Sequence, residues 1–140
     1  MRISARCDYA CKALLELALH WPSKEPLQIN AISKKQDIPT RYLVNILIQL
    51  KRMGLVTSIR GKEGGYNLAK PPSKITLSTV MRQTAGPFLP VADSVLKNKS
   101  VFPTIWKELE NAMTKALSKI TFEDITNKVK GMENTINYQI

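Results

Sequence analysis

Apolar residues recur at three- and four-residue intervals along much of the chain, which is the spacing of one face of an α-helix. The pattern predicts a first helix from a Ser4 cap to about His20 and a second helix over about 29–36. A third helix begins at Pro39 and ends at Gly54. The predicted buried stripe of this third helix is Tyr42, Leu43, Ile46, Leu47, Leu50 and Met53.

Two short runs of strand-forming residues, 55–59 and 66–69, follow the third helix and enclose a glycine-rich turn. Paired glycines let the backbone reverse tightly without a steric clash at Cβ. We therefore expect a β-hairpin with Arg60 and Lys62 at its tip. A helix followed by a cationic hairpin is typical of a winged helix, in which the helix enters the major groove of DNA and the wing reaches the adjacent minor groove.

The C-terminal half predicts three further helices. The first runs over about 77–85, and an irregular connection with three prolines occupies 86–103. A long helix over 104–119 has an apolar seam at near-heptad spacing. Thr121 and Asp124 resemble a capping box that begins a short last helix.

These elements predict a mainly α fold with a small β-hairpin wing, that is, a winged helix-turn-helix followed by a long C-terminal dimerisation helix. With 140 residues, of which 44% are hydrophobic, the chain can bury a core. The expected divisions are a DNA-binding domain over 1–85, a connecting loop over 86–103, a dimerisation helix and short final helix over 104–130, and a flexible tail over 131–140.

Positive charge gathers in the N-terminal half of the chain. The formal net charge is +10, of which residues 1–74 contribute +8 and residues 75–140 only +2. This asymmetry favours contact of the first half with a polyanion, and assembly or sensing in the second. No apolar run approaches the ~20 residues of a membrane span, and the N-terminus lacks the apolar core of a signal peptide. A cytoplasmic protein with no membrane partner is therefore expected.

The sequence offers little to catalysis. It contains one histidine and no nucleophile motif, phosphate-binding loop or cluster of carboxylates, so an enzyme is not expected. A winged helix that mediates protein contact or binds RNA is the alternative to a DNA-binding regulator. The basic wing and the polar face of the third helix favour DNA.

Short motifs occur along the chain in a recognisable order: Tyr9-Ala10, Ile38-Pro39, Tyr42-Leu43, Gly54-Leu55-Val56, Arg60-Gly61, Gly64-Gly65-Tyr66 and Ile75-Thr76-Leu77. In this order and spacing the chain resembles the Rrf-type (Rrf-two) family of bacterial winged-helix transcription regulators. The resemblance implies a homodimer in the bacterial cytoplasm that acts as a repressor on a pseudo-palindromic operator in double-stranded DNA.

Four residues of the third helix are predicted to contact base edges: Thr40, Arg41, Val44 and Asn45. Arginine can hold guanine through two acceptors, asparagine can pair with adenine, and valine can contact only a thymine methyl group. The predicted wing contacts are Arg60, Gly61 and Lys62, of which Arg60 resembles the family's minor-groove arginine.

Other predicted contacts carry no sequence information. Lys51 and Arg52, like Lys62 at the wing, are expected to bind phosphates. The long helix is expected to pair with that of a second copy, because an exposed apolar seam is unfavourable on a monomer. The predicted dimer interface is Trp106, Leu109, Met113, Leu117 and Ile120.

Many members of the family sense iron–sulfur status through three cysteines in the connection before the dimer helix. Residues 86–103 of this chain contain neither cysteine nor histidine, so no cluster or other cofactor is expected. Cys7 and Cys11, one helical turn apart, are weak metal candidates because two further ligands would be needed. Helix packing is the favoured role of both, and a redox switch at Cys7 is a minor hypothesis. Regulation by a small effector, bound between the wing domain and the dimer helix, and regulation by a partner protein both stay open.

Overall fold

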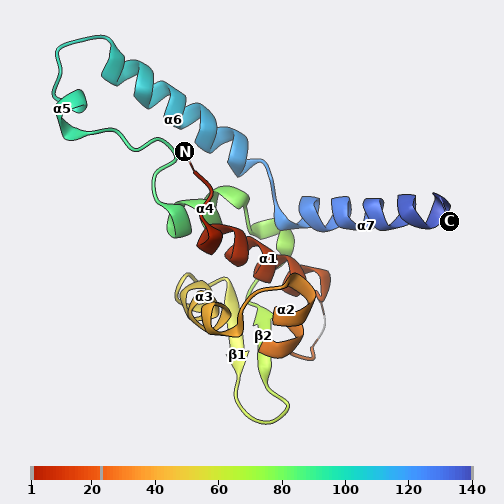
Figure 1. Ribbon diagram of the computed structural model, residues 1–140. Coiled ribbons are helices and arrows are strands. Elements are labelled where there is room, and N and C mark those ends of the chain that lie inside the picture. Colours follow the sequence, from red (N-terminus) through yellow and green to blue (C-terminus); the bar gives the residue numbers. More distant parts are fainter. Residues whose placement is uncertain (1, 23, 140) are drawn as a thin grey trace.

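In the computed structural model, helices dominate residues 2–22 and 24–139, the part of the chain that the structure describes (Figure 1). The elements are α1 (Ala5–Leu19), α2 (Ile29–Gln36), α3 (Thr40–Arg52), β1 (Val56–Ile59), β2 (Gly65–Leu68), a 3₁₀ turn η1 (Pro72–Lys74), α4 (Leu77–Ala85), α5 (Asp93–Leu96), α6 (Phe102–Ser118) and α7 (Phe122–Gln139). The expected fold class is confirmed, since the two strands form one antiparallel hairpin among helices. Among the described residues, no helix is long and apolar enough to cross a membrane.

Hydroxyl and carboxylate side chains begin three of the helices where the sequence predicts them. The hydroxyls of Ser4 and Thr76 each accept a hydrogen bond from an amide of the following turn, at 3.1 and 3.3 Å. At the start of α7 the Thr121 amide donates to Asp124 Oδ2 at 3.0 Å, and the Asp124 amide donates to Thr121 Oγ1 at 3.1 Å. These bonds satisfy amides that the first helical turn leaves without partners, so they fix where α1, α4 and α7 begin.

The core of the N-terminal domain forms around α1. Helices α2, α3 and α4 and the hairpin all contact it, and Phe122 anchors the first turn of α7 to the same core. Truncating a fully buried leucine here, such as Leu47, is expected to lower the free energy of unfolding by about 2–5 kcal/mol. The main buried residues of this core are Ala10, Ala13, Leu14, Leu17, Ile32, Leu43, Ile46, Leu47, Leu50, Leu55, Val56, Ile75 and Val80.

Two glycines set the path of the chain from α3 into the hairpin. Gly54 takes a left-handed φ of 75° and ends α3, with its amide donating to the Lys51 carbonyl at 3.0 Å. Gly65 pairs with Ile59 and has Leu27 close against it, so that a Cβ at this position would lie 2.3 Å from the Leu27 carbonyl oxygen. A larger residue at Gly65 would therefore push the second strand away from the backbone it contacts.

The C-terminal half departs from the sequence prediction in three places. The connection is not irregular throughout, because residues 93–96 form the one-turn helix α5. Helix α6 begins at Phe102 rather than Thr104, since Pro103 is well suited to a first helical turn. The prediction of a short last helix is wrong, because α7 continues through Gly131 to Gln139, so the segment predicted as a flexible tail is helical as far as Gln139. Glycine in a helix costs about 1 kcal/mol relative to alanine and need not end it.

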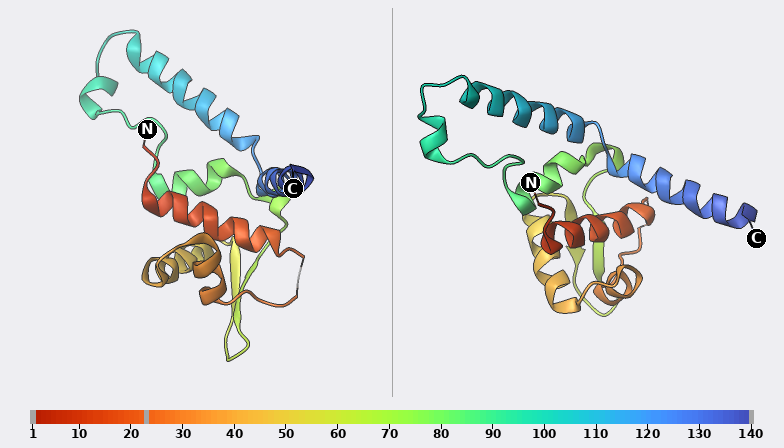
Figure 2. Two further views of the ribbon diagram at one scale, coloured as in Figure 1. Left: turned by 45° about the vertical axis from the view of Figure 1, so that its right-hand side comes forward. Right: turned by 45° about the horizontal axis from the view of Figure 1, so that its top comes forward.

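The hairpin and α6 lie at opposite ends of the molecule. In all three views of Figures 1 and 2, α2, α3 and the hairpin form one end, α1 and α4 the middle, and α6 the other end. The second half of α7 extends past the N-terminal domain. A surface on α3 and the hairpin is thus separated from any surface on α6.

Candidate nucleic-acid interface

The exposed face of α3 carries the four residues predicted to contact bases. Thr40, Arg41, Val44 and Asn45 are all exposed, whereas Leu43 and the other buried leucines of α3 belong to the core around α1. Because a helix advances about 100° per residue, positions three and four apart share this face. The four side chains can therefore enter a groove together, and their contact with DNA stays a prediction.

Tyr42 lies at the edge of this face, and its predicted place in the core is wrong. Its side chain is 46% exposed, and its ring stacks on that of Tyr9 in α1 with 6.2 Å between the centroids. The guanidinium of Arg41 lies 4.8 Å from the centroid of the Tyr42 ring and donates to its hydroxyl at 3.2 Å. The periodic pattern could not separate an edge position from a buried one.

The hairpin presents Arg60, Gly61 and Lys62, all exposed, at its tip. Two side-chain hydrogen bonds tie the hairpin to Gln28, the residue before α2, and to α3. The Gln28 amide group donates to the Lys62 carbonyl at 3.3 Å, and Lys51 Nζ donates to the Ser58 hydroxyl at 2.6 Å. These contacts fix the hairpin against α3 and the start of α2, and its tip projects from the end of the molecule where these two helices lie (Figure 1).

Lys51 and Arg52, both predicted to bind phosphates, differ in the contacts that their side chains make within the protein. Arg52 is exposed at the end of α3, and no partner of its side chain is found among the described residues. Lys51 spends one of its three N–H donors on the Ser58 hydroxyl and retains two. Lys51 can therefore hold the hairpin in place through Ser58 and still donate a hydrogen bond to a phosphate.

Two apolar side chains on this surface were missed as site residues by the sequence analysis. Ile48, one turn after Val44, is 41% exposed, and Ile59, next to Arg60, is 50% exposed. Apolar groups at these places suit contact with thymine methyl groups in the major groove and with sugar surfaces beside the wing. Helical periodicity places Ile48 opposite the buried stripe of α3, as the structure confirms, but nothing in the sequence assigns either side chain a role at an interface.

Some residues of the apolar seam of α6 pack against their own chain, and others are exposed to solvent. Met113 and Leu117, both predicted at the dimer interface, are half-buried and pack against the cluster of Cys7, Met81 and Phe88 in their own chain. Trp106 is half-buried and stacks on Phe102 with 5.5 Å between the ring centroids. The side chains that stay open to solvent include Phe102, Ile105 and Leu109, 39–51% exposed, and Ile120 at 37%.

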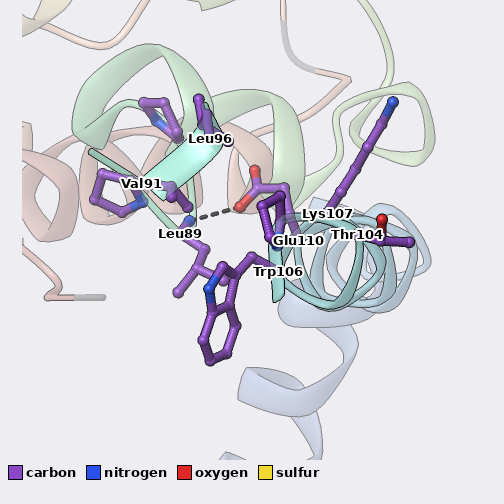
Figure 3. Close-up of a pocket in the computed structure, with 10 residues that line it drawn as sticks. Leu89, Val91, Leu96, Thr104, Trp106, Lys107 and Glu110 are labelled. Atoms are coloured by element: carbon purple, nitrogen blue, oxygen red, sulfur yellow. Dashed lines mark hydrogen bonds between the residues drawn. The ribbon is translucent and has the colours of Figure 1, made fainter. Parts of the chain in front are cut away.

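The connection between α4 and α6 forms an open pocket of about 720 Å³ against the first turns of α6 (Figure 3). Its lining is mostly apolar, with Trp106 on one side and prolines and leucines of the connection on the other. The Glu110 carboxylate accepts a hydrogen bond from the Leu89 amide at 2.6 Å and lies 3.3 Å from Arg82 Nη2. Glu110 thus ties the connection and α4 to α6.

The two cysteines pack inside the protein. Cys7 is fully buried and Cys11 half-buried, both against the cluster between α1, α4 and α6. Burial, and then the neighbouring Cys7, raises the pKa of Cys11 to about 12. A protonated thiol is neither a nucleophile nor a metal ligand. Among the described residues, no group of three His, Cys, Asp or Glu side chains is placed to hold a metal ion.

Comparison with known proteins gives matches over most of the chain. A family model described as "Rrf2: Iron-dependent Transcriptional regulator" matches residues 3–128. A relative from Synechocystis sp., provisionally named an HTH-type transcriptional regulator, is 36% identical over 129 residues, which cover 89% of this chain and 87% of the relative.

Two solved structures share the fold. CymR, the global cysteine regulator of B. subtilis, superposes with a TM-score of 0.79 at 29% identity, over 91% of this chain and 98% of CymR. IscR of T. potens superposes with a TM-score of 0.74 at 26% identity, over 92% of this chain and 88% of IscR.

Proposed function

The chain belongs to the Rrf2 family of transcriptional regulators, and from this premise we propose that it represses transcription as a homodimer bound to a pseudo-palindromic operator. It is a DNA-binding regulator and not an enzyme.

The observation that carries the proposal is the shared placement of the α3 face and the wing. Arg41 in the first turn of α3 and Arg60 at the wing tip are both exposed cations. Figure 1 shows α3 and the hairpin at the end of the molecule opposite α6. A helix of about 10–12 Å diameter fills a major groove about 12 Å wide, which leaves the wing beside the neighbouring minor groove. Arg41 and Asn45 would then read bases while Arg60 enters the minor groove.

A second copy would cover the exposed stripe of α6. Phe102, Ile105 and Leu109 lie three and four residues apart, so they form one apolar line along the helix. An exposed line of this kind is unfavourable in water and suits an isologous contact with the same line of a partner. Because α6 is remote from the wing, this contact leaves both DNA-binding surfaces free.

We further propose that the regulator acts without an iron–sulfur cluster, although the family model is described as iron-dependent. The residues do not fit a cluster. Residues 86–103 provide no cysteine or histidine, and the two cysteines of the chain lie on α1, where Cys11 has a raised pKa. Thiolates are the usual ligands of such clusters.

One experiment tests these points together. The purified protein is used to select fragments of genomic DNA, and its absorption spectrum is recorded after anaerobic purification. We expect fragments that share a pseudo-palindrome, and a colourless protein. In transcription assays with a promoter that carries the selected site, added protein should lower transcript yield. Fragments without a shared sequence would contradict the operator proposal, visible-range absorption from bound iron would contradict the cofactor proposal, and a higher yield would contradict repression.

A further inference from the structure

A notch of about 380 Å³ lies between the first turns of α1 and the flank of α3 that faces α1. We propose that this notch binds a phosphate of the DNA backbone, with Arg6 as the principal contact. The inference rests on the proposed function and adds to it a contact outside both α3 and the wing. The residues that line the notch are Ala5, Arg6, Tyr9, Tyr42, Asn45 and Ile46.

The orientation of Arg6 is fixed by α3. Its Nε and Nη2 atoms both donate to Gln49 Oε1, at 3.0 and 2.7 Å. Gln49 is itself fixed, because its amide nitrogen donates to the Gln83 carbonyl at 3.0 Å. A guanidinium has five N–H donors in a rigid fork, so Gln49 takes two and leaves three, including those at the far end of the fork. That end matches two oxygens of a phosphate.

The chemistry around Arg6 favours an anion. The hydroxyls of Tyr9 and Tyr42, both in the lining, can donate hydrogen bonds to it. None of the lining residues is acidic. The acidic residue nearest in sequence to Arg6, Asp8, forms an ion pair with Lys12 at 2.8 Å.

The notch also lies where a phosphate is expected. The two backbones that border a major groove run along the two flanks of a helix inserted into it. Lys51 lies on one flank of α3 and contacts Ser58 of the hairpin. The wing would therefore contact the DNA backbone that runs along this flank. Counted at 100° per residue, Tyr42 and Gln49 lie on the opposite flank, against α1. The notch would bind a phosphate on the second border of the groove through Arg6, which is not among the residues predicted to contact DNA.

The test measures affinity for a selected operator and for unrelated duplex DNA as a function of salt. The variants are Arg6→Ala, Arg6→Lys and Tyr42→Phe, with Lys130→Ala on α7 as the charge-matched control. Arg6→Ala should weaken binding to both duplexes by a similar factor, about tenfold or more, because phosphate contacts carry no sequence information. The slope of log K against log salt should fall by about 0.9 per subunit. Arg6→Lys should restore part of the slope but not the affinity, and Lys130→Ala should change neither.

A second measurement locates the phosphate. Single phosphates of the operator are replaced by uncharged methylphosphonates, and one position on each half-site should weaken wild-type binding while leaving the Arg6→Ala protein unaffected. Circular dichroism shows whether each variant remains folded, and Tyr42→Phe, which keeps the Arg6–Gln49 bonds, tests the notch should Arg6→Ala unfold. Wild-type affinity and salt slope in the folded Arg6 variants, together with weakened operator binding in Arg41→Ala, would refute the notch and leave the proposed function standing. Unchanged binding in Arg41→Ala and Arg60→Ala as well would refute both.

Discussion

The guanidinium of Arg41 lies over the ring of Tyr42, 4.8 Å from its centroid, and donates to the Tyr42 hydroxyl. Tyr42 stacks in turn on Tyr9, so Arg41 is attached through two rings to α1. The arginine that we propose to read guanine is thus directed to one flank of α3 in the free protein. Binding to a base edge must exchange these contacts for hydrogen bonds with guanine.

This arrangement predicts the effect of changing Arg41. Arg41→Ala should lose discrimination at one G·C pair of each half-site, worth about 1–3 kcal/mol, because the bidentate contact with guanine disappears. Tyr42→Phe removes only the hydroxyl and should keep that discrimination. Competition binding with operators mutated one base pair at a time measures both. Arg41→Ala with an unchanged preference at every position would show that Arg41 does not read a base.

The wing predicts a different result for each of its cations. Arg60→Ala should weaken operator binding and relax the preference for A·T pairs beside each half-site, because a narrow minor groove attracts arginine. Lys62→Ala should lower affinity equally on all sequences, with a salt slope smaller by about 0.9 per subunit. The same loss on every sequence for both variants would contradict the separate roles.

Substitutions on the exposed side of α6 should affect dimer assembly, whereas those on the side that packs on its own chain should affect stability. Leu109→Asp should give monomers in sedimentation velocity and weaken operator binding by about 10²–10⁴-fold, because the two half-sites are no longer bound by linked subunits. Met113→Ala should lower the melting temperature while the dimer persists, since Met113 packs on its own chain. Glu108→Gln, at an exposed position of the same helix, is the control. A Leu109→Asp protein that remains dimeric would place the interface elsewhere.

The raised pKa of Cys11 predicts that its thiol reacts slowly with alkylating reagents and that the folded protein loses stability at alkaline pH. With its pKa raised from 9.0 to about 12, Cys11 should react with iodoacetamide at pH 8 only after unfolding, as mass spectrometry can measure. The folded state holds this proton more tightly than the unfolded state, so the contribution to stability is complete below pH 9.0 and is lost as the pH rises from there toward 12. Rapid labelling of Cys11 in the folded protein would contradict this environment.

Much of the fold follows from local chemistry that a sequence displays. The caps at Ser4, Thr76 and Thr121, and the glycine that ends α3, act within one turn of the residues concerned, so their positions were predicted. The end of α7 was not predicted, because glycine only weakens a helix and the outcome depends on the residues around it.

The candidate site likewise has features that the sequence predicts and features that only the tertiary structure shows. Exposure of Arg41, Asn45 and Arg60 follows from helical periodicity and from a turn, which a sequence shows. The contact of Arg6 with Gln49 joins residues 43 positions apart, and the two directions of the α6 seam depend on how α6 lies against α1 and α4. Such relationships arise from tertiary packing and leave no periodic signal.

Hydroxyl-radical footprinting on a selected genomic fragment shows whether two copies of the protein place α3 and the wing on one face of duplex DNA. We expect two protected windows related by twofold symmetry, with centres one helical turn or a multiple of it apart, and loss of protection at the outer edge of each window in Arg60→Ala. A single unpaired window, or protection that is identical in the wild type and in Arg60→Ala, would show that α3 and the wing do not bind DNA in this way.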